Sequence, residues 1–475
     1  MKLAGWVWIV ALAGLGGCAQ FGDSRPAAEK ISLPPMTQTL RDAQTGAWPV
    51  SDWWRQFGSP ELNRLIETAL AENPDLGVAA ARLRQARALV DGQAAALYPT
   101  VSANVAFSAQ RFSANSVQAK LAGEQFRQLL IDPVVLRYHL DLWGRDRAEL
   151  QQTVDGALAS AAELTDAQLM LAGSVARAYF DLVAAEQQRL VGERLLYSRR
   201  RLLALAARRR DSGLSGDAPW LNTQIDLGES EASLAATGAS VELGRHLLAA
   251  LAGRGPDWGA DIRVEHAAPA WPGLPADLPL HLLARRPDVS AARLRAEAAA
   301  EAVHVALTEF YPDVNLIGLA GLHSVSLTDV VFHGSSLAYA VGPSLTFPLF
   351  EGGRLRANLA DSEAGYDAAV EFYNATLSTA AREVVDAVSR GREAFATAEA
   401  LVQNLADAER TKRVADILRQ TGLSDAAGPL QAAVVVDRLH WRIATAQAAR
   451  AKAVVALCEA LGGGFQEDQV LSVGR

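Results

Sequence analysis

The chain has 475 residues, 50% of them hydrophobic and 21% charged, and its formal net charge is −8 at pH 7. This composition is ample for a folded core, and the mild acidity argues against nucleic acid as a partner. Of the two cysteines, Cys458 lies among apolar residues, so we expect a small buried side chain rather than a reactive thiol.

The first residues have the pattern of a secretory signal. Lys2 precedes an apolar run at 3–15, and small residues follow before Cys18. The end of this run resembles a bacterial lipobox, which implies that 1–17 is a lipoprotein signal peptide and Cys18 the lipidation site. Ala19 then implies sorting to the outer membrane, whereas the alternative is a plain signal peptide with an accidental cysteine. No other run of about 18 apolar residues occurs, so we expect no transmembrane helix in the mature chain.

The segment 18–58 is predicted to be an N-terminal tether and anchor. Up to Val50 it is rich in Pro, Ser, Thr, Asp and Gly without periodicity, which is typical of a tether or of a segment lying over another surface. Trp53, Trp54 and Phe57 follow. We expect these aromatic residues to pack the segment onto the body of the protein rather than to form a binding platform.

The rest of the chain contains an internal repeat with a period of roughly 210 residues. Asn-Pro-Asp-Leu at 73–76 recurs as Arg-Pro-Asp-Val at 286–289, and Gly-Leu-Ser at 213–215 recurs at 422–424. The predicted organisation is a first repeat at 59–254, a Pro-rich linker at 255–279, a second repeat at 280–464 and a C-terminal tail at 465–475.

Each repeat is predicted to contain a short helix, two strands, a long helix, a tight turn and a medium helix. The stretch from Arg145 to Ser212 lacks proline and is rich in helix-forming residues, so it predicts one helix of roughly 100 Å. Apolar residues at heptad spacing, here and in the second repeat, require partner helices. Alternating apolar and polar residues predict strands at about 100–112, 127–141, 313–324 and 336–350.

The predicted strands have the length that tilted strands need to cross an outer membrane. Four strands cannot close a barrel, and open sheet edges are not tolerated in lipid. The chain must therefore oligomerise, or the strands lie outside a membrane.

The motifs together resemble the TolC family, most of all its NodT-type lipoprotein branch, the outer membrane factors of tripartite efflux pumps. Besides the lipobox and the repeat, the resemblance rests on Leu-Asp-Leu-Trp-Gly-Arg at 140–145, Ala-Arg-Arg-Pro-Asp-Val at 284–289, Phe-Tyr-Pro at 310–312 and Pro-Leu-Phe-Glu-Gly-Gly-Arg at 348–354. It covers about residues 48–465. It implies a mostly α fold whose tandem helix/β-hairpin/helix repeats form a trimeric twelve-stranded β-barrel, continued by a periplasmic α-helical barrel.

The resemblance implies an outer membrane channel of a tripartite RND-type efflux pump, a passive exit duct for drugs or other small molecules. The implied partners are two further copies in a homotrimer, outer membrane lipid, a periplasmic adaptor (membrane fusion) protein and, through the adaptor, an inner membrane RND transporter. The implied location is the outer membrane, with an anchor at Cys18 and the helices in the periplasm. Two alternatives remain open: a lipid-anchored periplasmic helical scaffold, or the outer membrane channel of a type I protein secretion system.

In relatives the turn between the long and the medium helix forms the tunnel tip, where the adaptor docks. Glycine permits the sharp turn, leucine offers an apolar contact and serine can cap the next helix. A turn without a docking role is the alternative. The matching residues are Gly213, Leu214, Ser215, Gly422, Leu423 and Ser424.

Relatives also narrow the tip with aspartates, but the corresponding positions here hold Gly428 and Gln431, which puts that gate in doubt. Asp217 and Asp425 lie nearer the turns and are the candidate constriction residues, because threefold repetition would bring like charges together. Either residue is equally explained by the preference for aspartate near a helix start.

The sequence contains no recognised catalytic signature. It lacks a Gly-x-Ser-x-Gly elbow, His-Glu-x-x-His, a Walker A loop and Ser-x-x-Lys, and its eight histidines are scattered without ligand spacing. We therefore predict a protein that is not an enzyme, with no cofactor and no metal site.

Overall fold

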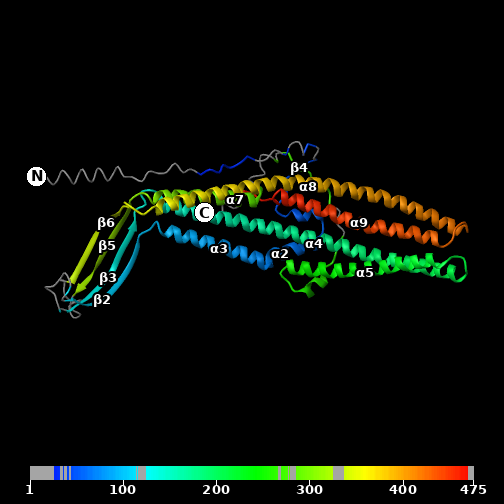
Figure 1. Cartoon of the computed structure of the whole chain (residues 1–475), viewed down its shortest axis with the longest axis horizontal. Coiled ribbons are helices and arrows are strands. Elements are labelled where there is room, and N and C mark those ends of the chain that lie inside the picture. Colours follow the sequence, from blue (N-terminus) through cyan, green and yellow to red (C-terminus); the bar gives the residue numbers. More distant parts are fainter. Residues whose placement is uncertain are drawn as a thin grey trace. The chain divides into compact units, whose positions relative to one another are not determined.

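The computed structural model describes residues 26–32, 36, 40–41, 44–113, 115, 123, 125–265, 269–276, 278, 285–324 and 336–468 (Figure 1). The chain divides into two compact units, and each draws on both repeats. Cys18 and the predicted signal peptide lie outside the described residues. The strand unit comprises Met1–Lys30, Arg84–Ala159 and Ala292–Tyr373, and the helical unit comprises Ile31–Leu83, Ser160–Ala291 and Asn374–Arg475.

Each repeat contains one helix of 67 residues, α4 (Arg145–Asp211) and α8 (Arg354–Gln420). Both are free of proline, as a long uninterrupted helix requires. In the helical unit α5 folds back along α4, and α9 along α8 (Figure 1). Among the described residues, no helix is both long and apolar enough to cross a membrane. The other helices are α2 (Pro60–Glu72), α3 (Pro74–Ala95), α5 (Asp217–Leu251), α7 (Pro287–Thr308) and α9 (Ala427–Ala460), with 3-10 helices η1 (Trp53–Phe57) and η3 (Pro256–Asp261).

The strand unit is built on a four-stranded antiparallel sheet with the order β2-β3-β5-β6. β2 (Thr100–Arg111) and β3 (Gln125–His139) form one hairpin, and β5 (Asp313–Ser324) and β6 (Leu337–Thr346) form the other. β3 pairs with β5, so β2 and β6 are the edges. β6 ends before the expected limit near 350, and Pro348, which has no N–H to donate to a ladder, follows shortly after.

The two faces of this sheet differ in chemistry, which is the alternation that the sequence predicts. One face carries Ser102, Asn104, Asn315 and Ser344 and an Asp132–His323 ion pair of 2.7 Å, together with a few apolar residues of the central strands, namely Leu130, Val135, Ile317 and Leu319. The other face is more uniformly apolar. The residues that share the apolar face are Val101, Val105, Phe107, Leu129, Ile131, Val134, Leu136, Leu316, Leu322, Leu337, Tyr339, Val341 and Leu345.

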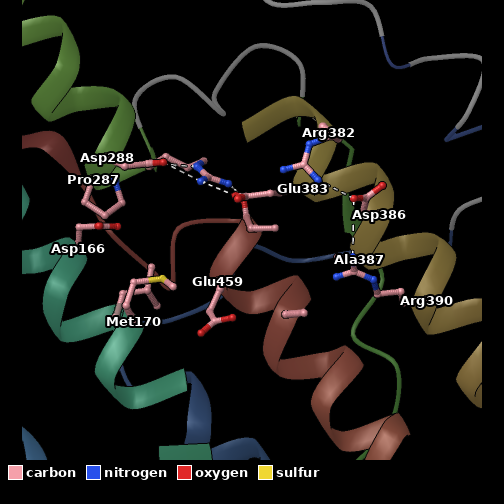
Figure 2. A pocket seen from close by; sticks show the side chains of 14 residues that line it. Asp166, Met170, Pro287, Asp288, Arg382, Glu383, Asp386, Ala387, Arg390 and Glu459 are labelled. Carbon is pink, nitrogen blue, oxygen red and sulfur yellow. Dashed lines mark hydrogen bonds and ion pairs between the residues drawn. The ribbon is translucent and has the colours of Figure 1, made fainter. Parts of the chain in front are cut away.

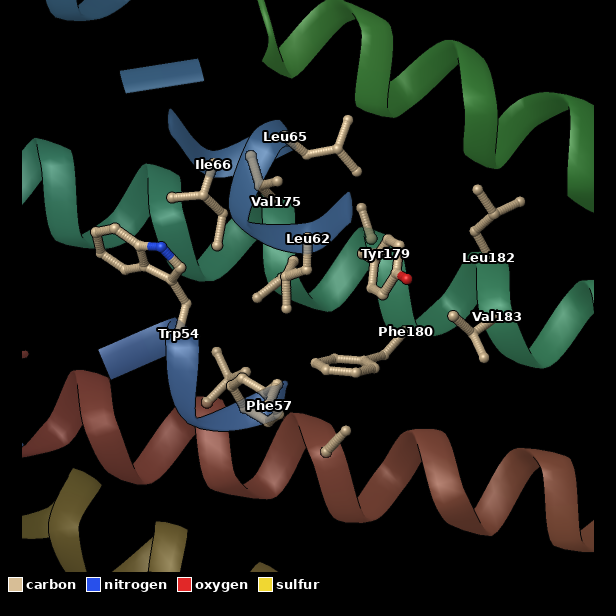
Figure 3. Close-up of a cluster of buried hydrophobic side chains, with 14 of the residues drawn as sticks. Trp54, Phe57, Leu62, Leu65, Ile66, Val175, Tyr179, Phe180, Leu182 and Val183 are labelled. Carbon is tan, nitrogen blue, oxygen red and sulfur yellow. The ribbon is translucent and has the colours of Figure 1, made fainter. Parts of the chain in front are cut away.

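An apolar core lies at the centre of the helical unit, around Tyr179 of α4 (Figure 3). Trp53, Trp54 and Phe57 belong to this core, with exposed fractions of 2%, 9% and 5%. The ring of Phe57 packs against Phe180 with 4.9 Å between the centroids. These aromatic residues are buried against the body of the protein, as expected for an anchor.

The linker between the repeats packs on the long helices. The N–H of Glu265 donates to the Tyr179 hydroxyl at 2.9 Å, and the ring of Trp271 lies edge-on to Phe395 of α8 with 5.7 Å between centroids. A Cβ atom at Gly391 would lie 2.3 Å from the Trp271 ring. Glycine therefore stands in the heptad seam of α8 because the indole fills the space of a side chain.

A hydrogen bond at the same place in each repeat ties the start of the short helix to the end of the medium helix. Asn73 Nδ2 donates to the carbonyl of Leu251 at 2.9 Å, and Arg286 Nη1 donates to the carbonyl of Ala460 at 3.1 Å. The last carbonyls of a helix lack intrahelical partners. The repeated x-Pro-Asp motif supplies the donor in both repeats.

Glycines make these two joints possible. Gly253 and Gly462 have φ values of 70° and 81°, in the left-handed region. A Cβ atom at Gly253 would lie 2.5 Å from the carbonyl oxygen of Glu72, and one at Gly462 would lie 1.8 Å from that of Arg285. Any other residue would push the joined helices apart.

Cys458 of α9 is buried, with an exposed fraction of 2%, which confirms the expectation from its apolar neighbours. Burial raises the pKa of its thiol to about 12, although Gln56 Nε2 donates to Sγ at 3.3 Å. The thiol therefore stays neutral at physiological pH.

Candidate functional site

The first tip joins α4 to α5 through a Schellman turn. The N–H of Gly213 donates to the carbonyl of Arg210 at 2.9 Å, and the N–H of Leu214 donates to that of Arg209 at 2.8 Å. Gly213 has a φ of 72°, where a side chain would strain the backbone. Glycine at this position therefore ends the long helix and turns the chain.

The second tip repeats this geometry between α8 and α9. The N–H of Gly422, at a φ of 75°, donates to the carbonyl of Arg419 at 3.1 Å. The N–H of Leu423 donates to the carbonyl of Leu418 at 2.8 Å. The duplicated Gly-Leu-Ser motif thus builds two equivalent turns.

Each tip exposes one leucine. Leu214 and Leu423 have exposed fractions of 77% and 76%, although the residue at this position of a Schellman turn commonly packs back on its own helix. Burying a leucine side chain is worth about 1.5–3 kcal/mol. The two leucines are therefore available to stabilise contact with a partner.

The serines of the motif do not cap the following helices, so that expectation is wrong. At the start of α5 the N-cap residue is Gly216, which has no side chain to accept a bond, and Ser215 is only partly buried. At the start of α9, Asp425 Oδ1 accepts from the N–H of Ala427 at 2.9 Å, while Ser424 Oγ lies 3.4 Å from the carbonyl of Asp425. A carboxylate is the stronger acceptor for these N–H groups.

Asp425 also connects the two tips. Its Oδ2 lies 3.1 Å from Arg209 Nη2, and the two side chains are 51% and 56% exposed. Beside this ion pair lies a groove of about 170 Å³, whose apolar lining includes Leu205 and Leu214. Such an exposed ion pair contributes on the order of 1 kcal/mol or less, so by itself it holds the two tips together only weakly.

The other candidate constriction residue, Asp217, is exposed in the first turn of α5, where negative charge is favoured by the helix dipole. Gly428 and Gln431, at the positions of the family's aspartates, lie in the first two turns of α9. Asp425 is therefore the acidic residue that the structure places at the second turn.

Contacts between α4 and α5 stiffen the first tip. The guanidinium of Arg210 lies over the ring of Trp220 at 4.2 Å from its centroid, and Arg199 pairs with Asp226. The sequence carries no signal for these contacts, because only the antiparallel return of α5 brings their residues together.

A second polar site in the helical unit is lined by Asp166, Asp288 and Glu383 (Figure 2), together with Arg286. Arg286 is 6% exposed and pairs with Asp288 at 2.7 Å and with Glu383 at 2.8 Å. A cavity of about 490 Å³ adjoins it, and Asp166 of α4 lies at its wall. Burial, reinforced by the charge of Asp288, raises the pKa of Asp166 to about 6. Arg286 stands in a motif that the sequence singles out, but its role in joining three helices is visible only in the fold.

Comparison with known proteins identifies the class. The outer membrane efflux protein family model matches residues 65–254 and 278–463. Among solved structures, the chain is similar to the outer membrane protein VceC of Vibrio cholerae (30% identity, TM-score 0.78, 88% of this chain and 100% of that one). It is similar as well to the outer membrane channel OprN (27% identity, TM-score 0.82, 93% of this chain and 98% of that one).

Two relatives have names that agree with this family. The fusaric acid resistance protein FusA of Burkholderia cepacia is 34% identical over 361 residues, which cover 74% of this chain and 67% of that protein. The multidrug resistance outer membrane protein MdtP of Escherichia coli is 28% identical over 468 residues, 95% of this chain and 94% of that protein. The chain belongs to the outer membrane efflux protein family.

Proposed function

We propose that three copies of this chain form a twelve-stranded β-barrel in the outer membrane, continued by a periplasmic helical barrel, as the exit duct of a tripartite efflux pump. The observation that carries the proposal is the four-stranded sheet, whose edges β2 and β6 lack a partner strand among the described residues. Unpaired backbone groups are not tolerated in lipid. Because all three pairings in the sheet are antiparallel, β2 of one copy would run antiparallel to β6 of the next, so the ring can close without a mismatch.

The two faces of the sheet fit this arrangement. Barrel strands in a membrane place apolar residues toward lipid and polar residues toward the lumen. The face with Val105 and Val341 would meet lipid, and the face with Asn104, Asp132 and His323 would line the duct.

The adaptor would bind at the tips, where Leu214 and Leu423 are exposed. In this proposal Asp217 and Asp425 line the constriction, and the weak Arg209–Asp425 pair is a contact that opens when the tips move. An inner membrane RND transporter, reached through the adaptor, would supply energy and select the cargo. The names of MdtP and FusA, which refer to multidrug and fusaric acid resistance, support small molecules as cargo.

Lipid modification of Cys18 would add a second attachment to the outer membrane. Together with the barrel it would fix the chain at that membrane, and the outer membrane names of the relatives support this location. Labelled palmitate should be incorporated by the wild type and not by Cys18→Ser, and equal incorporation would contradict the assignment.

Purification and bilayer recording test the proposed function. The full-length protein should elute as a detergent-soluble trimer, migrate differently before and after heating, and conduct ions in planar bilayers. A monomer that leaves the membrane once its lipid is removed, without conductance, would support the scaffold instead. A deletion strain should become more sensitive to small toxic compounds, whereas loss of one secreted protein without such sensitivity would support type I secretion.

A further inference from the structure

Two arginines lie on the apolar face of the sheet, at the end where the hairpins turn. Arg127 of β3 is opposite Ala109, and Arg111 of β2 is opposite Gln125. The previous pair on the same face is Phe107 with Leu129. Both guanidinium groups therefore stand directly beyond the last large apolar pair, and both residues are exposed. We call Arg111 and Arg127 the loop-end arginines.

Two arginines at the starts of the long helices, at the opposite end of the sheet, have partners within the chain. Arg145 Nε lies 3.0 Å from Glu149, and Arg354 Nε lies 2.8 Å from Glu351. Neither loop-end arginine forms an ion pair with a carboxylate in the part of the chain that the structure describes. Both guanidinium groups are therefore open to an anion from outside these residues.

The spacing along the strand puts the loop-end arginines at a membrane surface. The ten-residue step from Val101 to Arg111 rises about 34 Å, and a strand tilt of roughly 45° reduces the height to about 24 Å. The apolar band of an outer membrane barrel is about 25 Å tall. Trp143 and Tyr311 lie beyond Val101, toward the helices, and their rings stack with 5.0 Å between the centroids. The two residues are 45% and 42% exposed. Large aromatic rings with a polar group are typical of the interface between a membrane and water.

An arginine beside hydrocarbon is costly unless it reaches an anion at the membrane surface. Guanidinium matches phosphate with two parallel hydrogen bonds, which makes this pair stronger than one with a neutral headgroup. In the proposed assembly, the strand ends that adjoin the helices face the periplasm. The strand ends that adjoin the hairpin loops therefore face the outer leaflet.

We propose that Arg111 and Arg127 bind a phosphate group of the phosphorylated glycolipid of the outer leaflet and thereby fix the depth of the barrel. The proposal rests on the proposed function, since it requires the sheet to lie in the outer membrane with its helices in the periplasm. Three copies would provide three such sites around the barrel.

Lipid binding to the full-length detergent-solubilised trimer tests this proposal, with native mass spectrometry as the readout and diphosphoryl lipid A as the probe. The wild type should bind this lipid at least tenfold more tightly than enzymatically dephosphorylated lipid A. R111Q/R127Q should lose that preference, and R111K/R127K should retain part of it. The matched control is Arg137→Gln, which changes an arginine of β3 on the opposite face and should leave the preference unchanged.

Full phosphate preference in R111Q/R127Q would overturn the proposal, and so would equal binding of phosphatidylglycerol or equal competition by inorganic phosphate. If R111Q/R127Q does not assemble, the wild type alone tests the proposal. Equal binding of phosphorylated and dephosphorylated lipid A by the wild type would also overturn the proposal. A wild-type protein that forms no conducting trimer contradicts the proposed function. A conducting trimer without phosphate preference contradicts only this inference.

Discussion

Replacing Asp166 with asparagine is expected to stabilise the helical unit at neutral pH. Burial is the main reason that the pKa of Asp166 rises from 3.8 to about 6, and Asp288, Glu383 and Glu459 raise it further while Arg286 opposes them. The charged form is therefore disfavoured in the folded state. The difference in pKa corresponds to roughly 3 kcal/mol of destabilisation at pH 7, which asparagine would remove.

The pH dependence gives this prediction a definite sign. Because the pKa of Asp166 is higher in the folded than in the unfolded chain, the folded state takes up the proton first as the pH falls. The destabilisation is complete above about pH 7, shrinks as the pH falls through about 6 and is gone below about 4. The gain from Asp166→Asn should follow the same course.

Thermal unfolding of the detergent-solubilised protein between pH 4 and pH 8 measures this effect. Asp166→Asn should unfold at a higher temperature than the wild type at pH 7.5 and at the same temperature near pH 4. Glu383→Gln is the matched control from the same cavity. It loses the 2.8 Å pair with Arg286 and should destabilise at neutral pH. A variant at position 166 that is no more stable than the wild type at pH 7.5, or whose gain does not change with pH, would refute the reasoning.

Three further predictions concern the tips and the joints. Leu214→Glu and Leu423→Glu should weaken adaptor binding at least tenfold in a pull-down titration while the trimer persists, and unchanged binding would remove the docking role. Asp425→Ala should lower the cation preference in bilayer recordings, and an unchanged reversal potential would exclude this residue from the constriction. Gly462→Ala should lower the free energy of unfolding by about 3 kcal/mol, and Gly58→Ala by about 1 kcal/mol, because Gly58 also has a positive φ but open space around it. Equal losses of unfolding free energy in the two variants would contradict the contact with the Arg285 carbonyl.

The start of one helix is marked by a local signal in the sequence that is easy to overlook. α2 was not expected, although Ser59 followed by Pro60 is typical of a helix start, and Ser59 Oγ accepts from the N–H of Leu62 at 3.2 Å. The burial of α2 could not be deduced in the same way. Leu62 and Ile66 are fully buried because α4 lies against them, and α4 begins far along the chain.

The seam of α8 shows the limit of periodicity. Val384 and Val388 are 0% and 2% exposed, as heptad spacing predicts for a helix seam. The same spacing marks Gly391, yet nothing in the sequence indicates that Trp271 of the linker takes the place of its side chain. Periodicity tells which face is covered and leaves open what covers it.

The sequence by itself determined the long helices, the Gly-Leu turns and the two faces of the strands, because each depends on residues close together in the chain. Glycine at positive φ and period-two alternation act locally, so the repeats show them twice. The tertiary structure alone decided that Asp425 pairs with Arg209, that Arg286 joins three helices, and that β3 pairs with β5. These contacts join residues far apart in the sequence, and each depends on how the chain folds back on itself.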